Sequence, residues 1–344
     1  MRALSSKLLV LGFLALAIAL ALYYNLSKPR ILILQSYSPA YSWTRDVNVG
    51  LNRVFDGHNR ISLRWYYMGT KRHPWPEYRA KAGRLALRAV RAWKPDVIIA
   101  VDDDAQRLVA RHFVDTPGIS IVYAGVNGGV AKYGYDHADN VTGISERFPL
   151  PAIRGALLAA VANGSLPAKA RMYYLGDRSN SVSADTVFVR HFAWSPVRLA
   201  VVRQVATFPQ WQQAVAEAQR KGDFIMAANY HQLRESEGSR KLVPPRRVVA
   251  WTEANSKIPV IGLDGFFVDD GGMFSVGKSP IEQGRAAARM ALQIVHQHRA
   301  ASSIKPLLPS EFGIYMRGTL MQQFHFRLPP IYEAFARETG HYTP

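Results

Sequence analysis

The chain has 344 residues and no cysteine, which excludes disulfide scaffolds, cysteine zinc sites, iron–sulfur clusters and thiol catalysis. With 48% hydrophobic and 11% aromatic residues it can bury a sizeable core, and its length predicts about two domains. The 43 Lys and Arg against 25 Asp and Glu give a net charge of +18. Because no module interleaves these charges with stacking aromatics, we expect no nucleic-acid partner.

The first thirty residues are typical of an export signal or a membrane anchor. An uncharged, mostly apolar run at 8–27 follows Arg2 and Lys7, and about 20 apolar residues suffice for a helix that crosses a bilayer. No clear cleavage site interrupts the run, so we favour an uncleaved inner-membrane anchor, with a cleaved signal peptide as the alternative. Arg2 and Lys7 would hold the N-terminus in the cytoplasm and place the rest in the periplasm.

Short apolar runs alternate with helical patterns between residues 31 and 145. The apolar runs predict buried parallel strands at 31–34, 96–101 and 119–123. Apolar side chains recur every three or four residues over 76–93, with basic residues opposite, which predicts an amphipathic helix. Further helices are expected at 47–55 and 105–113. Such repeated units form a parallel sheet with helices on both faces.

The same alternation restarts after residue 150. We expect helices at 152–162, 183–192 and 211–220, and strands at 170–175, 198–202, 224–228 and 258–261. A strand at 272–276 then precedes a helix at 280–298. Ser279 is its expected N-cap, Pro280 its first residue, and Glu282 completes a capping box.

These elements predict an α/β protein of two doubly wound, parallel-sheet lobes joined by a hinge and preceded by a membrane helix. The first lobe is expected to comprise 31–145 and about 280–306, and the second 146–279 and about 307–344. Open α/β sheets bind ligands beyond the carboxyl ends of their strands, so the cleft between the lobes is the expected site. Glu146 lies at the first crossover, where we expect a hinge role or a ligand contact.

The candidate ligand-binding residues of the first lobe all follow predicted strands: Ser36, Tyr37, Trp43, Asp102, Asp103 and Asn127. The aromatic faces and the hydroxyl after the first strand can hold a planar ligand, with loop packing as the alternative. In the run 102–104 one carboxylate is expected to cap the next helix, and the others could bind an ammonium group. Ala124 and Gly125 allow close backbone approach before Asn127, or simply form a turn.

The candidate residues of the second lobe are Asp177, Ser179, Asn229 and Asp264. Ser179, Asn180 and Ser181 precede a helix, where amides and hydroxyls suit a carboxylate or phosphate or act as ordinary caps. Asn229 and Asp264 end strands, and for Asp264 a structural role at the hinge is the alternative.

Four segments in chain order carry a family resemblance: LQSYSPAYSWTRDVNVGL (34–51), KPDVIIAVDDDAQ (94–106), VYAGVN (122–127) and GGMFSVGKSPIEQGRAAARMAL (271–292). Together they resemble the periplasmic substrate-binding proteins of ABC transporters. The similarity is to the type I group, which includes tryptophan/tyrosine-binding proteins and the sensor regions of some bacterial histidine kinases. It covers about 31–320 and implies a two-lobed protein that closes about its hinge on a small ligand. A carboxylate at Asp264 would then face the cleft.

Other patterns are discounted. Residues 272–279 fit the P-loop expression, but MFSV is extended in character and the helix begins only at Pro280, after Lys278. His296 and His298 lie on different faces of a helix, so we expect no metal site and no cofactor. No G-x-S-x-G elbow marks a nucleophile, and a metal-dependent enzyme built on the acidic run lacks a complete catalytic set. We therefore expect no enzyme.

Two functions are compatible with these observations. The leading interpretation is an extracytoplasmic solute-binding protein that closes on a small ligand, such as an amino acid or an aromatic compound, for an ABC transporter permease. The alternative is a membrane-anchored sensing module that signals to a separate partner protein, which an uncleaved anchor favours.

Overall fold

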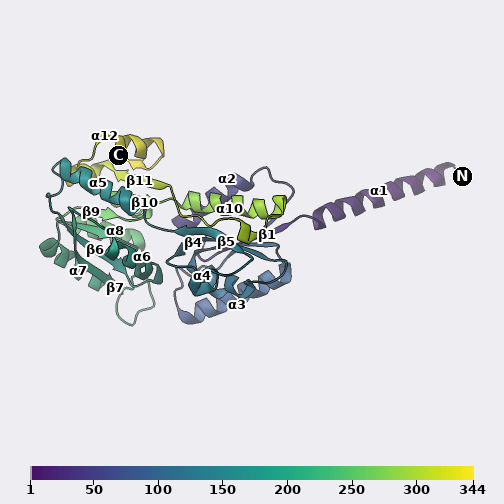
Figure 1. Ribbon diagram of the computed structural model, residues 1–344, viewed down its shortest axis with the longest axis horizontal. Coiled ribbons are helices and arrows are strands. Elements are labelled where there is room, and N and C mark those ends of the chain that lie inside the picture. The colour runs from purple at the N-terminus through teal and green to yellow at the C-terminus, as the bar shows by residue number, and fades with distance from the viewer. Residues whose placement is uncertain (1) are drawn as a thin grey trace.

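Two β-sheets with helices on both faces form the body of the molecule (Figure 1). The computed structural model describes residues 2–344, and their side chains from residue 10 onward. The first lobe is built on five strands in the order β2-β1-β3-β4-β5, and the second on seven in the order β12-β11-β10-β9-β8-β6-β7. The lobes lie side by side, and helix α1 projects away from the first (Figure 1).

All neighbouring strands of the first sheet pair in parallel. The strands are β1 (Arg30–Gln35), β2 (Ser62–Tyr67), β3 (Val97–Val101), β4 (Ser120–Asn127) and β5 (Val141–Glu146). Helices α2 (Ser42–Phe55) and α10 (Pro280–Gln297) cover one face. The other face carries α3 (Pro76–Trp93), α4 (Asp102–Leu108) and the 3₁₀ turn η1 (Ala110–Phe113). Two further 3₁₀ turns are η2 (Ala131–Tyr133) and η3 (Ala301–Ser303).

The second sheet is mixed. Its strands are β6 (Arg171–Asp177), β7 (Arg198–Val205), β8 (Phe224–Ala227), β9 (Val260–Gly262), β10 (Phe274–Lys278), β11 (Phe312–Arg317) and β12 (Tyr342–Thr343). The expectation of a wholly parallel sheet is wrong at β10 and β11, which pair antiparallel. The chain re-enters this lobe from the side where the parallel strands end, so β11 has to run the opposite way.

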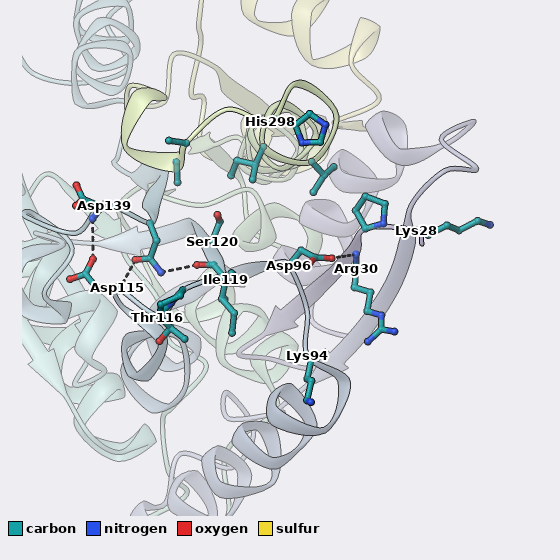
Figure 2. Close-up of a pocket in the computed structure, with 18 of the residues that line it drawn as sticks. Lys28, Arg30, Lys94, Asp96, Asp115, Thr116, Ile119, Ser120, Asp139 and His298 are labelled. Carbon is teal, nitrogen blue, oxygen red and sulfur yellow. Dashed lines mark hydrogen bonds between the residues drawn. The ribbon is translucent and has the colours of Figure 1, made fainter. Parts of the chain in front are cut away.

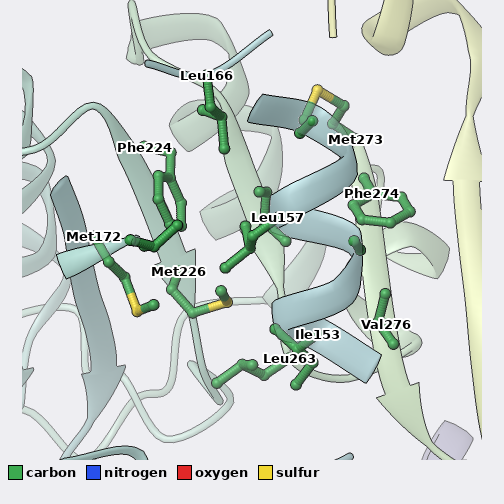
Figure 3. Close-up of a cluster of buried hydrophobic side chains, with 14 of the residues drawn as sticks. Ile153, Leu157, Leu166, Met172, Phe224, Met226, Leu263, Met273, Phe274 and Val276 are labelled. Atoms are coloured by element: carbon green, nitrogen blue, oxygen red, sulfur yellow. The ribbon is translucent and has the colours of Figure 1, made fainter. Parts of the chain in front are cut away.

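Helices cover both faces of the second sheet. One face carries α5 (Leu150–Ala162), α6 (Asn180–His191), α11 (Gly318–Gln323) and α12 (Pro330–Glu338). The other carries α7 (Phe208–Lys221), α8 (Pro245–Asn255) and α9 (Phe266–Asp269). Figure 3 shows α5 on the sheet, with Ile153 and Leu157 facing side chains of the strands such as Met226 and Phe274. This apolar contact holds the second lobe together.

Helices α2 and α10 approach each other so closely that both need glycine at the contact. A Cβ atom at Gly50 would overlap the carbonyl oxygen of Ile281, and one at Gly284 would overlap that of Val47. Since α10 is about 230 residues from α2 in the chain, this contact ties the late segment to the first lobe.

Several helix boundaries confirm the sequence analysis. Helix α3 occupies 76–93 as predicted, and α10 begins at Pro280 with the Ser279 hydroxyl accepting from the Glu282 N–H at 3.1 Å. The predicted role of the Glu282 side chain in the capping box is wrong. The Glu282 carboxylate instead accepts from the N–H groups of Ser310 and Glu311, at 2.9 and 3.0 Å. These donors belong to the segment that crosses back to the second lobe.

The start of α4 corrects a second prediction. The helix begins at Asp102, and no carboxylate of the acidic run caps it. Its cap comes from elsewhere in the chain, because the Ser36 hydroxyl accepts from the Ala105 N–H at 2.7 Å and donates to the Val101 carbonyl at 2.7 Å. Ser36 therefore joins the end of β1 to the start of α4.

Strands β2 and β5 have no counterpart among the predicted elements. β2 is an edge strand of sequence SLRWYY whose residues are only partly buried. β5 carries Gly143 in its centre, where a Cβ atom would overlap the Tyr123 carbonyl oxygen. Neither strand forms a continuous apolar run, so periodicity alone could not identify them.

Helix α1 spans Arg2–Leu26, and its apolar side chains from Val10 to Leu26 are exposed. Within the part of the chain whose side chains are described, no helix combines the length and apolarity needed for a membrane crossing. The anchor at 8–27 stays a prediction. The side chains of Arg2 and Lys7, predicted to orient it, lie outside the described part.

Glu253 of α8 is a buried carboxylate with one unsatisfied oxygen. Its Oε1 accepts from the Met273 N–H at 2.9 Å, whereas Oε2 has no partner. Burial raises the pKa of Glu253 to about 8, although Met273 and Arg317 lower it in part. Since the native state keeps a proton that the unfolded chain releases above about pH 4.5, this group lowers stability as pH rises from about 4.5 to 8.

We expect Glu253→Gln to stabilise the protein by about 2 kcal/mol at pH 8.5 and by much less at pH 5. The amide keeps the shape and the acceptor but cannot ionise. The measurement is the free energy of urea unfolding at both pH values for the two proteins. An equal effect at pH 5 and pH 8.5 would contradict the explanation.

Candidate functional site

A buried lysine joins three carboxylates where the two sheets meet. Lys278 ends β10, and its Nζ lies 3.4 Å from an oxygen of Asp264 and 3.6 Å from one of Asp185. It also donates a short hydrogen bond to Glu146, the last residue of β5. All four side chains are buried. We refer to Lys278, Glu146, Asp185 and Asp264 as the lysine cluster.

The charges of the lysine cluster do not balance. Burial raises the pKa of Glu146, with Lys278 opposing the shift, and raises the pKa of Asp185 to about 7. Burial alone would lower the pKa of Lys278, but the three carboxylates raise it well above its usual range. Lys278 is therefore charged at neutral pH. Because three carboxylates face one ammonium group in a buried site, Asp185 is partly protonated at neutral pH.

Beside the lysine cluster, aromatic rings from both lobes meet. Tyr41 of the first lobe has its ring centre 5.5 Å from Tyr37, 5.3 Å from His231 and 6.2 Å from Phe266. We refer to these four residues as the aromatic cluster. Asn229 donates to the Tyr41 hydroxyl at 3.5 Å across the cleft. The cluster offers ring faces and edges from both lobes to a flat or apolar group.

Lys71 lies against the aromatic cluster without a partner of opposite charge. Its Nζ is 5.2 Å from the ring centre of Tyr37 and 5.5 Å from that of Tyr41, and the residue is 5% exposed. Burial lowers the pKa of Lys71, while Asp177 and Asp102 oppose the shift. Among the carboxylates that the structure describes, none lies within ion-pair distance of it. The ammonium group also lies within cation–π distance of both rings.

Asp102 lies at the carboxyl end of β3 with one oxygen unused. Trp43 donates its indole N–H to Oδ1 at 2.9 Å, whereas Oδ2 is buried without a partner. Burial, with a contribution from Glu146, raises the pKa of Asp102 well above its usual range. Asp102 has φ +64° and faces Gly125, where a Cβ atom would come within 2.9 Å of its oxygen. Gly125 thus makes room for the Asp102 carboxylate.

An open pocket of about 270 Å³ leads from solvent into the cleft; we call it the entrance pocket. The first lobe contributes Tyr37, Arg79, Asp103, Asp104, Arg107, Arg111, Lys132 and Tyr133, and the second Ser179, Asn180, Ser181 and Gln232. Three predicted site residues, Tyr37, Asp103 and Ser179, therefore line one cavity. Its volume lies just below the usual range of small-molecule pockets, about 300–1,000 Å³.

The acidic residues of the entrance pocket are already paired. Asp103 lies 2.9 Å from the Lys132 ammonium group and accepts from the Tyr133 hydroxyl. Asp104 lies 3.2 Å from Arg79 and 2.7 Å from Arg107. Neither carboxylate is free to hold an ammonium ligand, which was the role suggested for the surplus acids of this run.

Two predicted site residues of the second lobe, Asp177 and Ser179, form hydrogen bonds within their own lobe. Asp177 accepts from the N–H groups of Ser179 and Gln232, at 2.9 and 3.0 Å. Ser179 is the N-cap of α6, since its hydroxyl accepts from the Val182 N–H at 3.4 Å. The ordinary cap considered for Ser179 is therefore present. Asn127, in the first lobe, donates to Asp185 at 3.5 Å across the cleft.

The predicted residues therefore divide into two groups. Trp43, Asp102, Asn229, Asp264 and Glu146 lie together at the deep part of the cleft, and Tyr37 connects them to the entrance pocket. Ser36 and Asp177 have their polar atoms engaged within their own lobes. Their roles in ligand binding stay predictions.

Sequence reasoning missed Lys71, Asp185, His231 and Lys278. Lys278 was discarded with the P-loop pattern, although a lysine that ends a strand next to a helix start lies at the ligand-binding edge of such a sheet. Lys71 follows β2, the strand without an apolar run. No local pattern distinguishes Asp185, which lies in the middle of a helix.

A larger hollow lies away from the cleft. It has a volume of about 800 Å³ and collects residues from the N-terminal ends of the first-lobe strands, among them Arg30, Asp96 and Ser120 (Figure 2). The Arg30 N–H donates to Asp96 at 2.7 Å, and Asp115 accepts from the Asp139 N–H at 3.0 Å. None of the predicted site residues lines it.

No protein-family model and no curated protein sequence matches the chain. Solved structures match over most of its length. A conserved domain protein from Vibrio cholerae O1 biovar El Tor has TM-score 0.67 and 15% identity, covering 92% of this chain and all of the other.

Two structures with bound ligands are also similar. An ABC domain from Streptococcus pneumoniae in complex with L-Trp has TM-score 0.65 and 16% identity, covering 90% of this chain and 98% of the other. An ABC transporter solute-binding protein from Clostridium phytofermentans with bound L-rhamnose has TM-score 0.54 and 12% identity, covering 91% and 99%. At such identities the likeness shows that this chain has the fold of these proteins.

Proposed function

We propose that the chain is an extracytoplasmic solute-binding protein whose lobes close on a small ligand, such as an amino acid or an aromatic compound, for an ABC transporter permease. The observation that carries this proposal is the meeting of both lobes around unsatisfied buried groups. Asp102 Oδ2 and the Nδ1 atom of His231 are buried without partners, and Lys71 is buried without a counter-charge. Groups of this kind are costly unless a ligand satisfies them.

Motion between the lobes is part of the proposal. Three chain segments cross between them, after Glu146, after Lys278 and between Ile304 and Phe312. In this proposal residues 31–145 with about 280–306 move against 146–279 with about 307–344. The ligand binds better to the closed form and so shifts a pre-existing equilibrium.

Apart from the contact of Lys278 with Glu146 at the first crossover, the polar contacts across the cleft are long. Asn229 meets Tyr41 and Asn127 meets Asp185 at 3.5 Å, and Arg240 meets Glu77 at 3.4 Å. These distances are at the upper limit of a hydrogen bond. Away from the lysine cluster, these contacts therefore stabilise a closed form only weakly, which supports a reversible opening.

Two of the similar structures contain a bound ligand, and together they indicate only a broad ligand class. One holds L-Trp and one holds L-rhamnose. Both ligands are small and carry several hydrogen-bonding groups, as the buried atoms of this cleft require. The proposal includes no chemical reaction, only the binding of a small molecule of this kind.

A second candidate function is supported by α1. Its exposed apolar side chains from Val10 to Leu26 would be covered in a bilayer. An anchored domain would then suit a sensing module that signals to a separate partner protein. Fractionation of cells that express the full chain tests the anchor, because release from membranes by high salt alone would contradict it.

The function is tested by a thermal-shift screen of the full chain, held in mild detergent, against amino acids, sugars, nucleosides and small organic acids. A ligand at 100 times its dissociation constant should stabilise the protein by about 2.7 kcal/mol. Small-angle scattering then measures closure. If the folded protein neither gains stability nor becomes more compact with any solute, the proposal fails.

We expect Asp102→Asn and Trp43→Phe each to weaken binding of a ligand found in this way about tenfold or more. Asp102→Asn changes the buried unsatisfied oxygen, and Trp43→Phe removes the donor that orients it. Isothermal titration measures the affinity. Arg88→Gln, an exposed change on α3, is the control and should leave the affinity unchanged.

A further inference from the structure

We propose that the entrance pocket selects solutes that carry a doubly charged anionic group, either a phosphate monoester or a dicarboxylate. This inference rests on the proposed function and names the chemistry of its ligand. It reverses the expectation from the sequence, where the acidic run suggested a cationic ligand.

The charges that line the entrance pocket do not cancel. Arg79, Arg107, Arg111 and Lys132 face only Asp103 and Asp104. The ion pair of Lys132 with Asp103 is neutral. Asp104 is shared by two arginines, which leaves one positive charge uncompensated. Arg111 forms no ion pair with any carboxylate that the structure describes, so the pocket has two positive charges in excess.

Both lobes take part in this pocket. The arginines come from α3, α4 and η1 of the first lobe, and Asn180 and Ser181 of α6 in the second lobe line the same pocket. An anion held by the arginines therefore lies within reach of donors from the other lobe. Such a bridging ligand supplies the strong contact that the long cross-cleft hydrogen bonds lack.

A buried lysine, Lys71, lies next to the entrance pocket. Tyr37 lines the entrance pocket, and the Lys71 ammonium group lies 5.2 Å from its ring centre. Lys71 is 5% exposed and unpaired among the described carboxylates. Lys71 thus adds an amino group without an ion-pair partner beside the pocket whose wall carries the arginines.

The deep carboxylates do not oppose this assignment. Three of them surround the charged Lys278 in the lysine cluster, which offsets part of their charge. Asp102 is buried and lies beside the Trp43 indole N–H. These acidic groups are only partly neutralised, but none of them lines the entrance pocket, where the cations are in excess.

The test measures binding of named probes to the full-length protein in mild detergent by isothermal titration. The anionic probes are glycerol phosphate and succinate, and the uncharged and cationic probes are glycerol and 1,4-diaminobutane. The variant is Arg111→Gln, which removes one uncompensated charge from the pocket wall. Arg84→Gln is the matched control, because Arg84 is exposed on α3 and does not line the pocket.

We expect at least one anionic probe to bind, with an affinity reduced about tenfold by Arg111→Gln, unchanged by Arg84→Gln, and falling as salt rises. Preference for glycerol phosphate identifies a phosphate monoester, and preference for succinate a dicarboxylate. No binding of either anion, or binding that Arg111→Gln leaves unchanged, overturns the inference. If solutes without an anionic group still bind and close the lobes, the inference fails but the proposed function stands.

Discussion

Replacing Lys278 by methionine is expected to destabilise the protein by about 3 kcal/mol or more at pH 8. The change keeps the length of the side chain but leaves Glu146, Asp185 and Asp264 buried without a cation. Breaking a buried ion pair on one side costs about 3–5 kcal/mol because the remaining charge is uncompensated. The free energy of urea unfolding measures the effect.

The loss should be smaller at pH 5.5. Without Lys278 the folded protein binds protons at these carboxylates more tightly than the unfolded chain does, so stability falls as pH rises. Asp185→Asn in the Lys278→Met background removes one of the uncompensated charges and should recover part of the loss. Lys241→Met is the control, because the Lys241 side chain is 74% exposed. It should change the free energy of unfolding by less than about 0.5 kcal/mol. If Lys278→Met lowered the free energy of unfolding by less than about 1 kcal/mol at pH 8, the three carboxylates would not be left with uncompensated negative charge.

Replacing Gly50 by alanine is expected to destabilise the protein by about 3 kcal/mol. The added methyl group would overlap the carbonyl oxygen of Ile281 in α10, and a backbone atom cannot rotate away as a side chain can. The two helices would have to separate along their contact. Thermal and urea unfolding measure the loss.

Gly155→Ala is the matched control for this prediction. Gly155 lies inside α5, is exposed, and has open space where the Cβ atom would stand. Since alanine favours helix over glycine by about 1 kcal/mol, this change should stabilise the protein slightly. If Gly50→Ala behaved like Gly155→Ala, the close packing of α2 on α10 would be disproved.

The entrance pocket and the lysine cluster respond to different variables. Ligand binding at the entrance pocket is expected to depend on salt, because its arginines are partly exposed. The lysine cluster is buried and is expected to respond to pH instead. Varying salt at fixed pH, and pH at fixed salt, therefore separates the two effects.

Local signals determined much of the fold. The apolar runs placed β1, β3, β6 and β8, and the three-to-four-residue spacing placed α3 with both its ends. The start of α10 was readable because Ser279 and Pro280 act on their immediate neighbours. Such signals depend on contacts within a few residues and can therefore be predicted from the sequence.

The strand ends also located the cleft. Asp102, Glu146 and Asp264 come from three different strand ends, and the rule that parallel strands present their carboxyl ends at one edge placed them together before any contact was known. The same rule, applied to Lys278, would have added the lysine. Lys278 fits the P-loop pattern by coincidence, since it ends β10 and the next helix begins only at Pro280.

Only the tertiary structure decided what these residues do. Whether Asp103 and Asp104 are free for a ligand depends on Lys132, Arg79 and Arg107, which reach them from other turns and elements. The cap of α4 comes from Ser36, about 70 residues earlier. Charge balance and burial are properties of groups gathered from distant parts of the chain, so no local pattern reveals them. For this reason the sequence alone predicted the cleft as the candidate site, and the folded structure decided that positive charge is in excess in its entrance pocket.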